Sequence, residues 1–358
     1  MYIRSWPYLT AMAVVLMFSS CSAVESTASG AGSTSTTEAD TASTTSAVTN
    51  PPDPGQSETL IVDVEGNANP AGDDTDAGPG DDKMSVEPNE YFGRSLELPV
   101  SAGELAEALS DVEQVLRADD PALTAQDLAG LGRYQQSLYR TLSFHPEWVD
   151  PVLAAVDEDV AAAVALNWEA RENLRDLLAT HTIHDTMPAW RIVEPFPAAE
   201  LLSYYKEAEE RTGIDWEYVA AINLVETRMG RIQGISTAGA VGPMQFLPTT
   251  WAECCEGDPT DPRDAIIGAA TYLTHRGGPD NMSKAIWGYN NSDYYVNAVT
   301  AYADVLRLNE RAYFGYHGWG IYFLTTSGVI FIEEGYEQAE EIPVTEWLGN
   351  NPDTLVTG

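Results

Sequence analysis

The strongest constraint on how this chain can fold is a change of composition near residue 90. Residues 22–90 consist largely of Ser, Thr, Ala, Gly, Asp and Pro, with fourteen acidic side chains and one basic one, Lys83. Such a segment buries too little apolar surface to offset the conformational entropy that folding removes. We therefore expect residues 21–90 to be a disordered acidic tether. A packed core is expected only in the longer remainder of the chain.

The first twenty residues have the features of an export signal. Arg4 supplies a positive charge, and the apolar run that follows, from Tyr8 to Phe18, is too short to span a bilayer comfortably. Small residues then precede Cys21, an arrangement that resembles the lipobox of bacterial lipoproteins, although Phe18 stands where Leu is usual. We expect residues 1–20 to be a lipoprotein signal peptide and Cys21 to be lipidated. The alternative is an ordinary cleaved secretory signal. The lipoprotein interpretation implies an extracytoplasmic protein, anchored to the membrane and facing the cell wall.

The formal net charge of −37 limits the classes of partner. Phosphate binding needs clustered Lys and Arg, so nucleic acid is not an expected partner. Electrostatic docking on anionic lipids is disfavoured for the same reason. We interpret the acidic surface as one that keeps the protein soluble, and we expect a monomer.

Residues 91–190 are expected to form a helical domain. Apolar residues recur at helical spacing from residue 102, and Ser101 with Glu104 makes a capping-box pattern. Further helices are predicted over residues 124–142, 151–156 and 160–178. We interpret His181, His184 and Asp185, which follow these helices, as part of a surface loop, because they make a thin ligand set for a metal.

Helical patterns resume after a Pro-rich connector at residues 187–197. Within a predicted catalytic domain of residues 191–312, we expect helices over residues 198–211, 215–229, 261–275, 281–289 and 293–308. Gly230 is expected to close the second of these in the left-handed conformation. Residues 320–336 alternate β-branched and aromatic side chains around Ser327-Gly328, which predicts a β-hairpin within a C-terminal β extension of residues 313–358. The expected fold is mainly α.

The remaining cysteines, Cys254 and Cys255, are adjacent in the sequence. Neighbouring Cα atoms lie about 3.8 Å apart, below the usual disulfide range, so a bridge between them would be strained. We interpret the pair as two packed or partly exposed thiols. No Cys or His partner lies at metal-ligand spacing, and the spacing of nearby aspartates does not match an EF-hand, so we expect neither a metal nor another cofactor.

Glu226 is the acidic residue whose position is most suggestive of chemistry. It follows Ile222 by four residues, which places it on or beside the apolar face of a helix and near that helix's C-terminus. Burial and the negative end of the helix dipole both raise the pKa of a carboxyl group. Periodicity alone leaves an alternative open, in which Glu226 bends to solvent or pairs with Arg228 or Arg231.

The segments around and after Glu226 form an ordered set of motifs. In sequence order they are Glu226-Thr227-Arg228-Met229-Gly230, the stretch from Ser236 to Trp251 with Gly242-Pro243-Met244-Gln245 inside it, Asp261-Pro262-Arg263-Asp264, and Ala285-Ile286-Trp287-Gly288-Tyr289-Asn290 followed by Tyr294 and Tyr295. This set resembles the catalytic domain of soluble lytic transglycosylases, which has a lysozyme-like fold. The resemblance covers about residues 195–305. Val225 and the Glu-Thr pair that follows it are similar to the membrane-bound B-type branch and to exported actinobacterial lipoproteins.

The resemblance implies a role for each motif residue. Glu226 would protonate the glycosidic oxygen and then act as the base, and Ser236 would lie beside the reacting sugar. The turn that contains Gly239 would let the backbone approach the glycan, as glycine permits. The other implied substrate-binding residues are Met244 and Gln245 in the cleft wall, Tyr289 and Asn290 as the pair that holds Glu226 and positions the sugar, and Tyr294 and Tyr295. For each of these residues the alternative is ordinary packing.

The segment from Ser236 to Pro248 contains no acidic residue, which bears on the mechanism. Most glycosidases use two carboxylates, and substrate-assisted enzymes are an exception. The resemblance implies that the N-acetyl group of MurNAc assists cleavage of the β-1,4 bond to GlcNAc in peptidoglycan. The sugar's own 6-hydroxyl then attacks and gives a 1,6-anhydroMurNAc end. The alternatives are a muramidase that activates water with Glu256 or Asp258, and an inactive peptidoglycan-binding lipoprotein.

Overall fold

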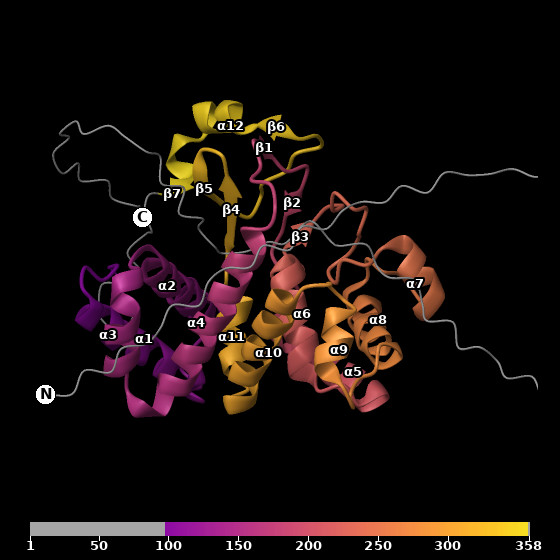
Figure 1. The fold of residues 1–358 in the computed structure, drawn as a ribbon, viewed down its shortest axis with the longest axis horizontal. Helices are drawn as coiled ribbons and strands as arrows, with labels where there is room; N and C mark the ends of the chain where they lie inside the picture. Colours follow the sequence, from indigo (N-terminus) through magenta and orange to yellow (C-terminus); the bar gives the residue numbers. More distant parts are fainter. Residues whose placement is uncertain (1–96, 357–358) are drawn as a thin grey trace, which may run out of the picture. The chain divides into compact units, whose positions relative to one another are not determined.

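The protein is described by a computed structural model that covers residues 97–356, and this part of the chain is mainly helical (Figure 1). The predicted signal peptide, Cys21 and the tether lie outside the described residues. Within residues 97–356 no helix is both long and apolar enough to cross a membrane. The prediction of a mainly α fold with a small β part is confirmed.

The N-terminal helices form where the sequence predicted them. They are α1 (Ala102–Arg117), α2 (Ala125–Phe144), α3 (Val149–Ala155), which follows a 3-10 turn at Pro146–Trp148, and α4 (Glu158–Leu178). Ser101 caps α1 by accepting a hydrogen bond from the amide of Glu104 (3.3 Å). A reciprocal capping box between Thr124 and Asp127 starts α2. Local cap chemistry therefore sets both helix starts.

A buried carboxylate joins these helices to a later part of the chain. Glu113 of α1 is fully buried, and its Oε1 accepts hydrogen bonds from Gln135 (2.8 Å), Tyr139 (2.7 Å) and Asn167 (3.3 Å) on α2 and α4. The hydroxyl of Tyr316, from helix α11 (Ala312–His317), donates to Oδ1 of Asn167 (2.6 Å). Buried polar groups that are satisfied in this way specify how helices pack.

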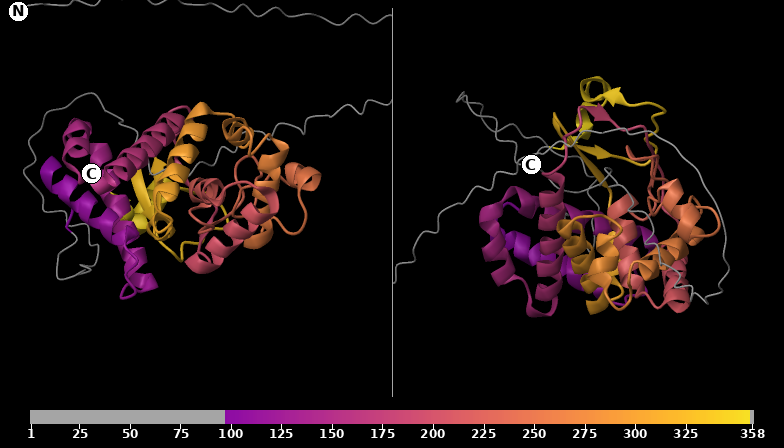
Figure 2. Two further views of the ribbon diagram at one scale, coloured as in Figure 1. Left: turned by 90° about the horizontal axis from the view of Figure 1, so that it is seen from below. Right: turned by 45° about the vertical axis from the view of Figure 1, so that its right-hand side comes forward.

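The second group of helices contains the motif residues. They are α5 (Ala198–Thr212), α6 (Trp216–Thr227), α7 (Pro248–Cys254), α8 (Pro262–His275), α9 (Met282–Trp287), α10 (Asp293–Leu308) and α11 (Ala312–His317). Helix α10 packs against α4 on one side and α6 on the other, and Figure 2 shows α4 and α10 side by side. One apolar cluster runs from Leu105 to Trp319, so the two groups of helices share a core.

The strands assemble from segments that are far apart in the sequence. Strand β1 (Thr186–Met187) pairs with β6 (Ile342–Pro343), β2 (Arg191–Ile192) pairs with β3 (Ile232–Gln233), and β4 (Ile321–Thr325), β5 (Gly328–Ile332) and β7 (Leu355–Val356) form a sheet in that order. The predicted hairpin is confirmed as β4–β5, with Thr325 opposite Gly328. Helix α12 (Val344–Asn350) and a 3-10 turn (Pro352–Thr354) complete this part.

We call strands β1–β7 together with α12 the β module. It has its own apolar cluster, which includes Trp190, Ile232, Phe323 and Ile330. Its residues come from the predicted connector, from the segment after Glu226 and from the predicted C-terminal extension. The sequence predicted only the hairpin, because the other strands are two residues long and too short to show a period.

The contact between α2 and α11 leaves no room for a side chain at Gly132. A Cβ there would lie 2.2 Å from the carbonyl oxygen of Gly315. We expect Gly132→Ala to lower the free energy of unfolding by about 1–3 kcal/mol, since the backbones must separate. The control is Gly103→Ala in α1, where a Cβ meets nothing within 4 Å. Urea denaturation of both variants measures the difference, and equal midpoints would contradict this packing.

Candidate active site

Helix α6 places Glu226 in the core near the helix's C-terminal end. Nearly every residue from Trp216 to Thr227 is buried, and Glu226 is 1% exposed. The helix ends earlier than predicted. Arg228 (φ 53°), Met229 (φ 60°) and Gly230 (φ 83°) all have left-handed backbone, and Arg228 is the cap. The prediction that Gly230 closes the helix is therefore wrong by two residues.

Tertiary hydrogen bonds explain this early end. The side chains of Asn223 and Thr227 both donate to the carbonyl oxygen of Pro243, at 2.7 and 2.6 Å. The hydroxyl of Thr227 also accepts from the amide of Gly230 (3.0 Å). These contacts hold the end of α6 against the later turn, while the amides of Arg228 and Met229 still bond the carbonyl oxygens of Leu224 and Asn223 (3.2 Å each).

The carboxyl group of Glu226 has one bonded oxygen and one without a partner. Its Oε1 accepts a hydrogen bond from the hydroxyl of Tyr295 (2.6 Å), while Oε2 is buried and has no hydrogen-bond partner in the described part of the chain. Burial raises the pKa of Glu226 to about 8, and the hydrogen bond from Tyr295 opposes this increase. The group is therefore protonated at neutral pH and carries a proton that it can donate.

Glu226 pairs with neither of the two arginines that the sequence offered as partners. Arg228 donates from Nη1 to the carbonyl oxygen of Leu224 (2.6 Å), and Arg231 pairs with Glu334. Neither guanidinium neutralises Glu226, and the carboxyl does not bend out to solvent.

The residue that holds Glu226 is Tyr295, not Tyr289. The hydroxyl of Tyr289 donates to the carbonyl oxygen of Met244 (2.6 Å). Burial, and then the charge of Glu226, raise the pKa of Tyr289 well above its usual value, so Tyr289 lies near the carboxyl while its hydroxyl bonds elsewhere. Asn290, beside Tyr289, is 5% exposed.

Of the two adjacent tyrosines on α10, only Tyr295 faces inward. Tyr295 is fully buried, whereas Tyr294 is 41% exposed. Tyr295 begins a helical series of buried residues with Ala298, Val299 and Tyr302. That spacing is a sequence signal that separates the two tyrosines. Binding of the substrate by Tyr294 stays a prediction, while Tyr295 acts on the carboxyl.

The turn after Ser236 is closed by its own backbone. The hydroxyl of Ser236 accepts from the amide of Ala240 (2.9 Å), and its proton stays available for donation. Gly239 (φ 87°) has open space where a Cβ would lie. At Gly242 a Cβ would lie 1.9 Å from the carbonyl oxygen of Pro259. Close approach of a ligand to the backbone is therefore feasible at Gly239, whereas Gly242 is required by packing.

Met244 and Gln245 shape this turn from inside. Met244 is completely buried in the main core, and a contact between its side chain and the glycan stays a prediction. Gln245 has left-handed backbone (φ 49°) and is 8% exposed, and its Nε2 donates to the carbonyl oxygen of Gly242 (2.9 Å). A contact between Gln245 and substrate stays a prediction.

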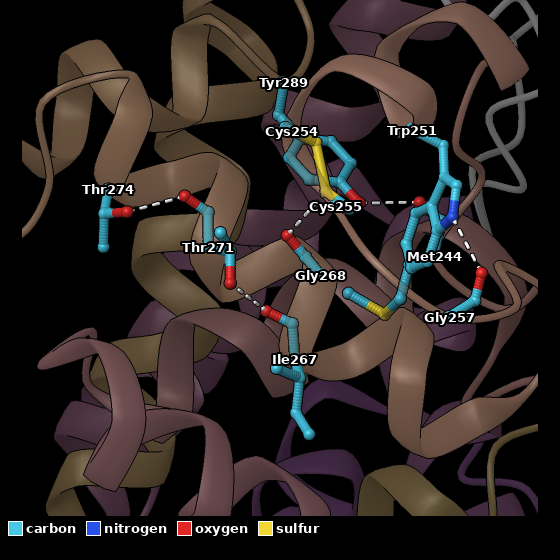
Figure 3. Close-up of a disulfide and its surroundings, with 10 residues drawn as sticks. All are labelled: Met244, Trp251, Cys254, Cys255, Gly257, Ile267, Gly268, Thr271, Thr274 and Tyr289. Carbon is cyan, nitrogen blue, oxygen red and sulfur yellow. Dashed lines mark hydrogen bonds between the residues drawn. A yellow bond between two sulfur atoms is a disulfide. The ribbon is translucent and has the colours of Figure 1, made fainter.

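Cys254 and Cys255 form a disulfide, so the interpretation of two thiols is wrong (Figure 3). Helix α7 ends at Cys254 and the chain becomes extended at Cys255, which lets adjacent side chains meet. Sγ of Cys255 lies 3.5 Å from the carbonyl oxygen of Gly268 on α8. Trp251, which lies on α7, packs edge-on against Phe246 with ring centroids 5.1 Å apart. The disulfide therefore lies where α7 packs on α8.

The acidic residues after α7 have structural roles. Oδ1 of Asp258 accepts from the amide and the hydroxyl of Thr260 (2.8 and 2.7 Å), and these bonds lower its pKa. Asp261 caps α8 by accepting from the amide of Asp264 (3.0 Å), as predicted. Glu256 is exposed. None of these carboxylates contributes to the pKa shift of Glu226.

The histidine segment beside the β module also has structural contacts. The ring of His184 stacks on Phe323 (5.1 Å between centroids), and Nδ1 of His181 lies 2.9 Å from the carbonyl oxygen of Leu177. Within residues 97–356, no group of three or more His, Cys, Asp or Glu side chains is placed to hold a metal ion.

Comparison with known proteins finds a similar domain in the part of the chain that contains Glu226. Residues 203–307, which include Glu226 and Tyr295, match the family model of the Transglycosylase SLT domain. This part of the chain is therefore similar to the SLT domain of transglycosylases. An 80-residue stretch is 36% identical to the membrane-bound lytic murein transglycosylase F of Alcanivorax borkumensis, and it spans 22% of this chain and 17% of that protein. No solved structure matches the chain significantly.

Removing the Tyr295 hydroxyl should change the acidity of Glu226. Its hydrogen bond lowers the pKa of the carboxyl, so we expect Tyr295→Phe to raise that pKa above the wild-type value of about 8. NMR titration of carboxyl-labelled glutamate measures this change. The control is Tyr313→Phe, which also removes a hydroxyl donor but one that bonds the carbonyl oxygen of Ala198 (3.0 Å). A Tyr295→Phe pKa equal to or below the wild-type value would contradict the assignment.

The raised pKa of Glu226 should also reduce stability as the pH increases. Between its ordinary value of 4.5 and about 8, the folded protein keeps the proton that the unfolded chain has lost. Stability therefore falls with pH in this window, by roughly 1 kcal/mol for each pH unit. We expect Glu226→Gln to remove this fall, so the variant gains stability over the wild type from pH 5 to pH 8. Denaturation curves with parallel pH dependence for the two proteins would exclude a buried acid.

Proposed function

We propose that this protein is a lytic transglycosylase that cleaves the β-1,4 bond between MurNAc and GlcNAc in peptidoglycan, with Glu226 as the catalytic acid. The observation that carries the proposal is the buried Glu226 carboxyl, which is protonated at neutral pH and has one oxygen without a partner. A general acid needs such a pKa, near the pH at which it works. The SLT domain match over residues 203–307 supports the same reaction.

In the first step, Glu226 donates its proton to the glycosidic oxygen. The bond between that oxygen and C1 of MurNAc breaks, and the leaving sugar departs with the proton. The N-acetyl oxygen of MurNAc stabilises the positive charge that develops at C1. The hydroxyl of Tyr295 stabilises the carboxylate left on Glu226, because its hydrogen bond favours the charged form.

In the second step, the carboxylate of Glu226 acts as the base. It takes the proton of the C6 hydroxyl of MurNAc, whose oxygen forms a bond with C1. The product is a 1,6-anhydroMurNAc end, and no water is consumed. One carboxyl group suffices for this sequence, which agrees with a pKa shift at Glu226 that has no contribution from a second carboxylate. The contacts of the two other candidate carboxylates favour the transglycosylase over a muramidase, because Glu256 is exposed and Asp258 is bonded to Thr260.

The glycan must reach a carboxyl that is 1% exposed in the free protein. We propose that the sugar opens a path beside the turn of residues 236–245. Ser236, with a hydroxyl proton to donate, Gly239, with open space beside it, and Gln245 are the residues proposed to meet the sugar there. Asn290 and the exposed ring of Tyr294 are proposed to bind along the same strand.

The proposed place of action is outside the cytoplasm, at the cell wall. The similar protein from Alcanivorax is named as membrane-bound, and the N-terminal sequence of this chain has an export signal followed by Cys21. We propose that a lipid on Cys21 anchors a monomeric enzyme to the membrane, where it takes part in cell-wall remodelling.

Digestion of purified sacculi tests the reaction. We expect wild-type protein to release muropeptides whose MurNAc ends are one water lighter than reducing ends, as measured by mass spectrometry. Glu226→Gln should slow release by about 10²- to 10⁴-fold, the usual contribution of a general acid. The matched control is Glu217→Gln, on the first turn of the same helix. Reducing ends alone would identify a hydrolase, and undiminished release by Glu226→Gln would refute the assignment of the acid.

A further inference from the structure

The segment that joins Glu226 to Ser236 lies on the β module. Its middle forms strand β3, which pairs with β2 in the register Arg191 to Gln233 and Ile192 to Ile232. The amide of Val193 donates to the carbonyl oxygen of Arg231 (2.9 Å). Ile232 is 4% exposed and belongs to the apolar cluster of the β module. This segment is therefore held by residues from outside the helical core.

Arg231 connects the same segment to the turn after β5. Its side chain is 6% exposed, forms an ion pair with Glu334, and donates from Nη2 to the carbonyl oxygen of His317 (2.9 Å). The turn itself is fixed, because the amide of Gly335 donates to the carbonyl oxygen of Ile192 (2.9 Å). A buried guanidinium with a carboxylate partner holds its two chain segments in one geometry.

Gly234 lies directly on an aromatic ring of the β module. A Cβ at this position would lie 2.4 Å from Cδ1 of Trp190. Trp190 is 5% exposed and packs edge-on against Phe323 of β4, with ring centroids 5.4 Å apart. Any larger side chain at position 234 must lift the segment or displace a ring that the β module holds.

The hairpin of the β module is occupied on both faces by the protein itself. Phe323 packs against Trp190 on one face. On the other, the guanidinium of Arg140 from α2 lies 3.6 Å from the ring centroid of Tyr322. The side chain of Gln136, also on α2, holds the start of β4 by bonding the amide and carbonyl of Gly320 (2.7 and 3.1 Å). Both faces of the hairpin are therefore used for packing within the protein.

We propose that the β module is part of the catalytic machinery, because it sets the position of the segment between the acid Glu226 and the sugar-binding Ser236. Arg231, Glu334 and Gly234 are its positioning residues. This inference rests on the proposed function, since it assigns a role to residues around that same site. The segment is short and continuous with the left-handed residues after α6 at one end and with the turn at Ser236 at the other, so a shift of its middle is passed on to both ends.

Two variants of the full chain test the inference. Gly234→Ala introduces the contact with Trp190, and Glu334→Ala removes the partner of Arg231, while Glu334→Gln keeps an acceptor. Displacement of catalytic groups by about 1 Å can cost about 100-fold in rate. We expect a fall in kcat of about 10- to 100-fold for Gly234→Ala, a fall for Glu334→Ala, and partial rescue in Glu334→Gln. The matched control is Gly349→Ala in α12 of the β module, where a Cβ meets nothing within 4 Å.

A second measurement does not depend on catalysis. Burial raises the pKa of Glu226 and the hydrogen bond from Tyr295 opposes this increase, while the nearby phenol of Tyr289 is affected by the charge of Glu226. If Gly234→Ala lifts the segment, water reaches the carboxyl and its NMR-measured pKa falls towards the ordinary value. A change that only weakened the fold would lower the unfolding temperature and leave the kcat of the folded molecules and this pKa unchanged.

The outcomes separate this inference from the proposed function. A wild-type protein that leaves sacculi intact would overturn the proposed function and, with it, the catalytic role of the β module. Wild-type cleavage with unaltered kcat and Glu226 pKa in both Gly234→Ala and Glu334→Ala would overturn the positioning role alone. Reduced kcat with a lowered Glu226 pKa in Gly234→Ala, and no change in Gly349→Ala, is the result that supports it.

Discussion

The hydrogen bond between Glu226 and Tyr295 is the interaction on which the rest of this structure depends. It connects two buried helices, α6 and α10, and within residues 97–356 it is the one hydrogen bond that the carboxyl group accepts. For Tyr295 to reach the carboxyl, α10 must lie against α6, and α10 is held there on its other side by α4. The N-terminal helices, which contain no motif residue of their own, therefore support the acid through α10.

One carboxyl oxygen of Glu226 lacks a hydrogen-bond partner in the described part of the chain, whereas the polar groups around it are hydrogen-bonded. Burying a carboxyl oxygen without a hydrogen-bond partner destabilises the fold. Hydrogen bonds of the neighbouring side chains offset this destabilisation. Asn223 and Thr227 share the carbonyl oxygen of Pro243, and Tyr289 bonds that of Met244. These bonds fix the turn beside the acid and leave the acid itself free of a neutralising partner. Such an arrangement is typical of catalytic groups, whose function needs a shifted pKa more than it needs stability.

The β module shows why linear boundaries describe this chain poorly. Its strands come from residues 186–192, from residues 232–233 beside the acid, and from residues 321–356. Because a strand must pair to satisfy its backbone, each of these segments depends on the others. The predicted boundaries near residues 190 and 312 follow composition and helix patterns, whereas the contacts of Arg231 and Trp190 cross both of them.

The sequence by itself determined the helices and several of their caps, and its motifs led to the proposal of Glu226 as the catalytic acid. Helical periodicity and caps such as Ser101, Thr124 and Asp261 act over three or four residues, so they can be recognised in the sequence. Only the tertiary structure decided that Tyr295 rather than Tyr289 holds Glu226, that α6 ends at Thr227, that Cys254 bonds Cys255, and that β2 pairs with β3. Each of these outcomes depends on which distant segments meet, or on the local backbone that such packing imposes. That information lies in the packing of the whole core and leaves no periodic trace in the sequence.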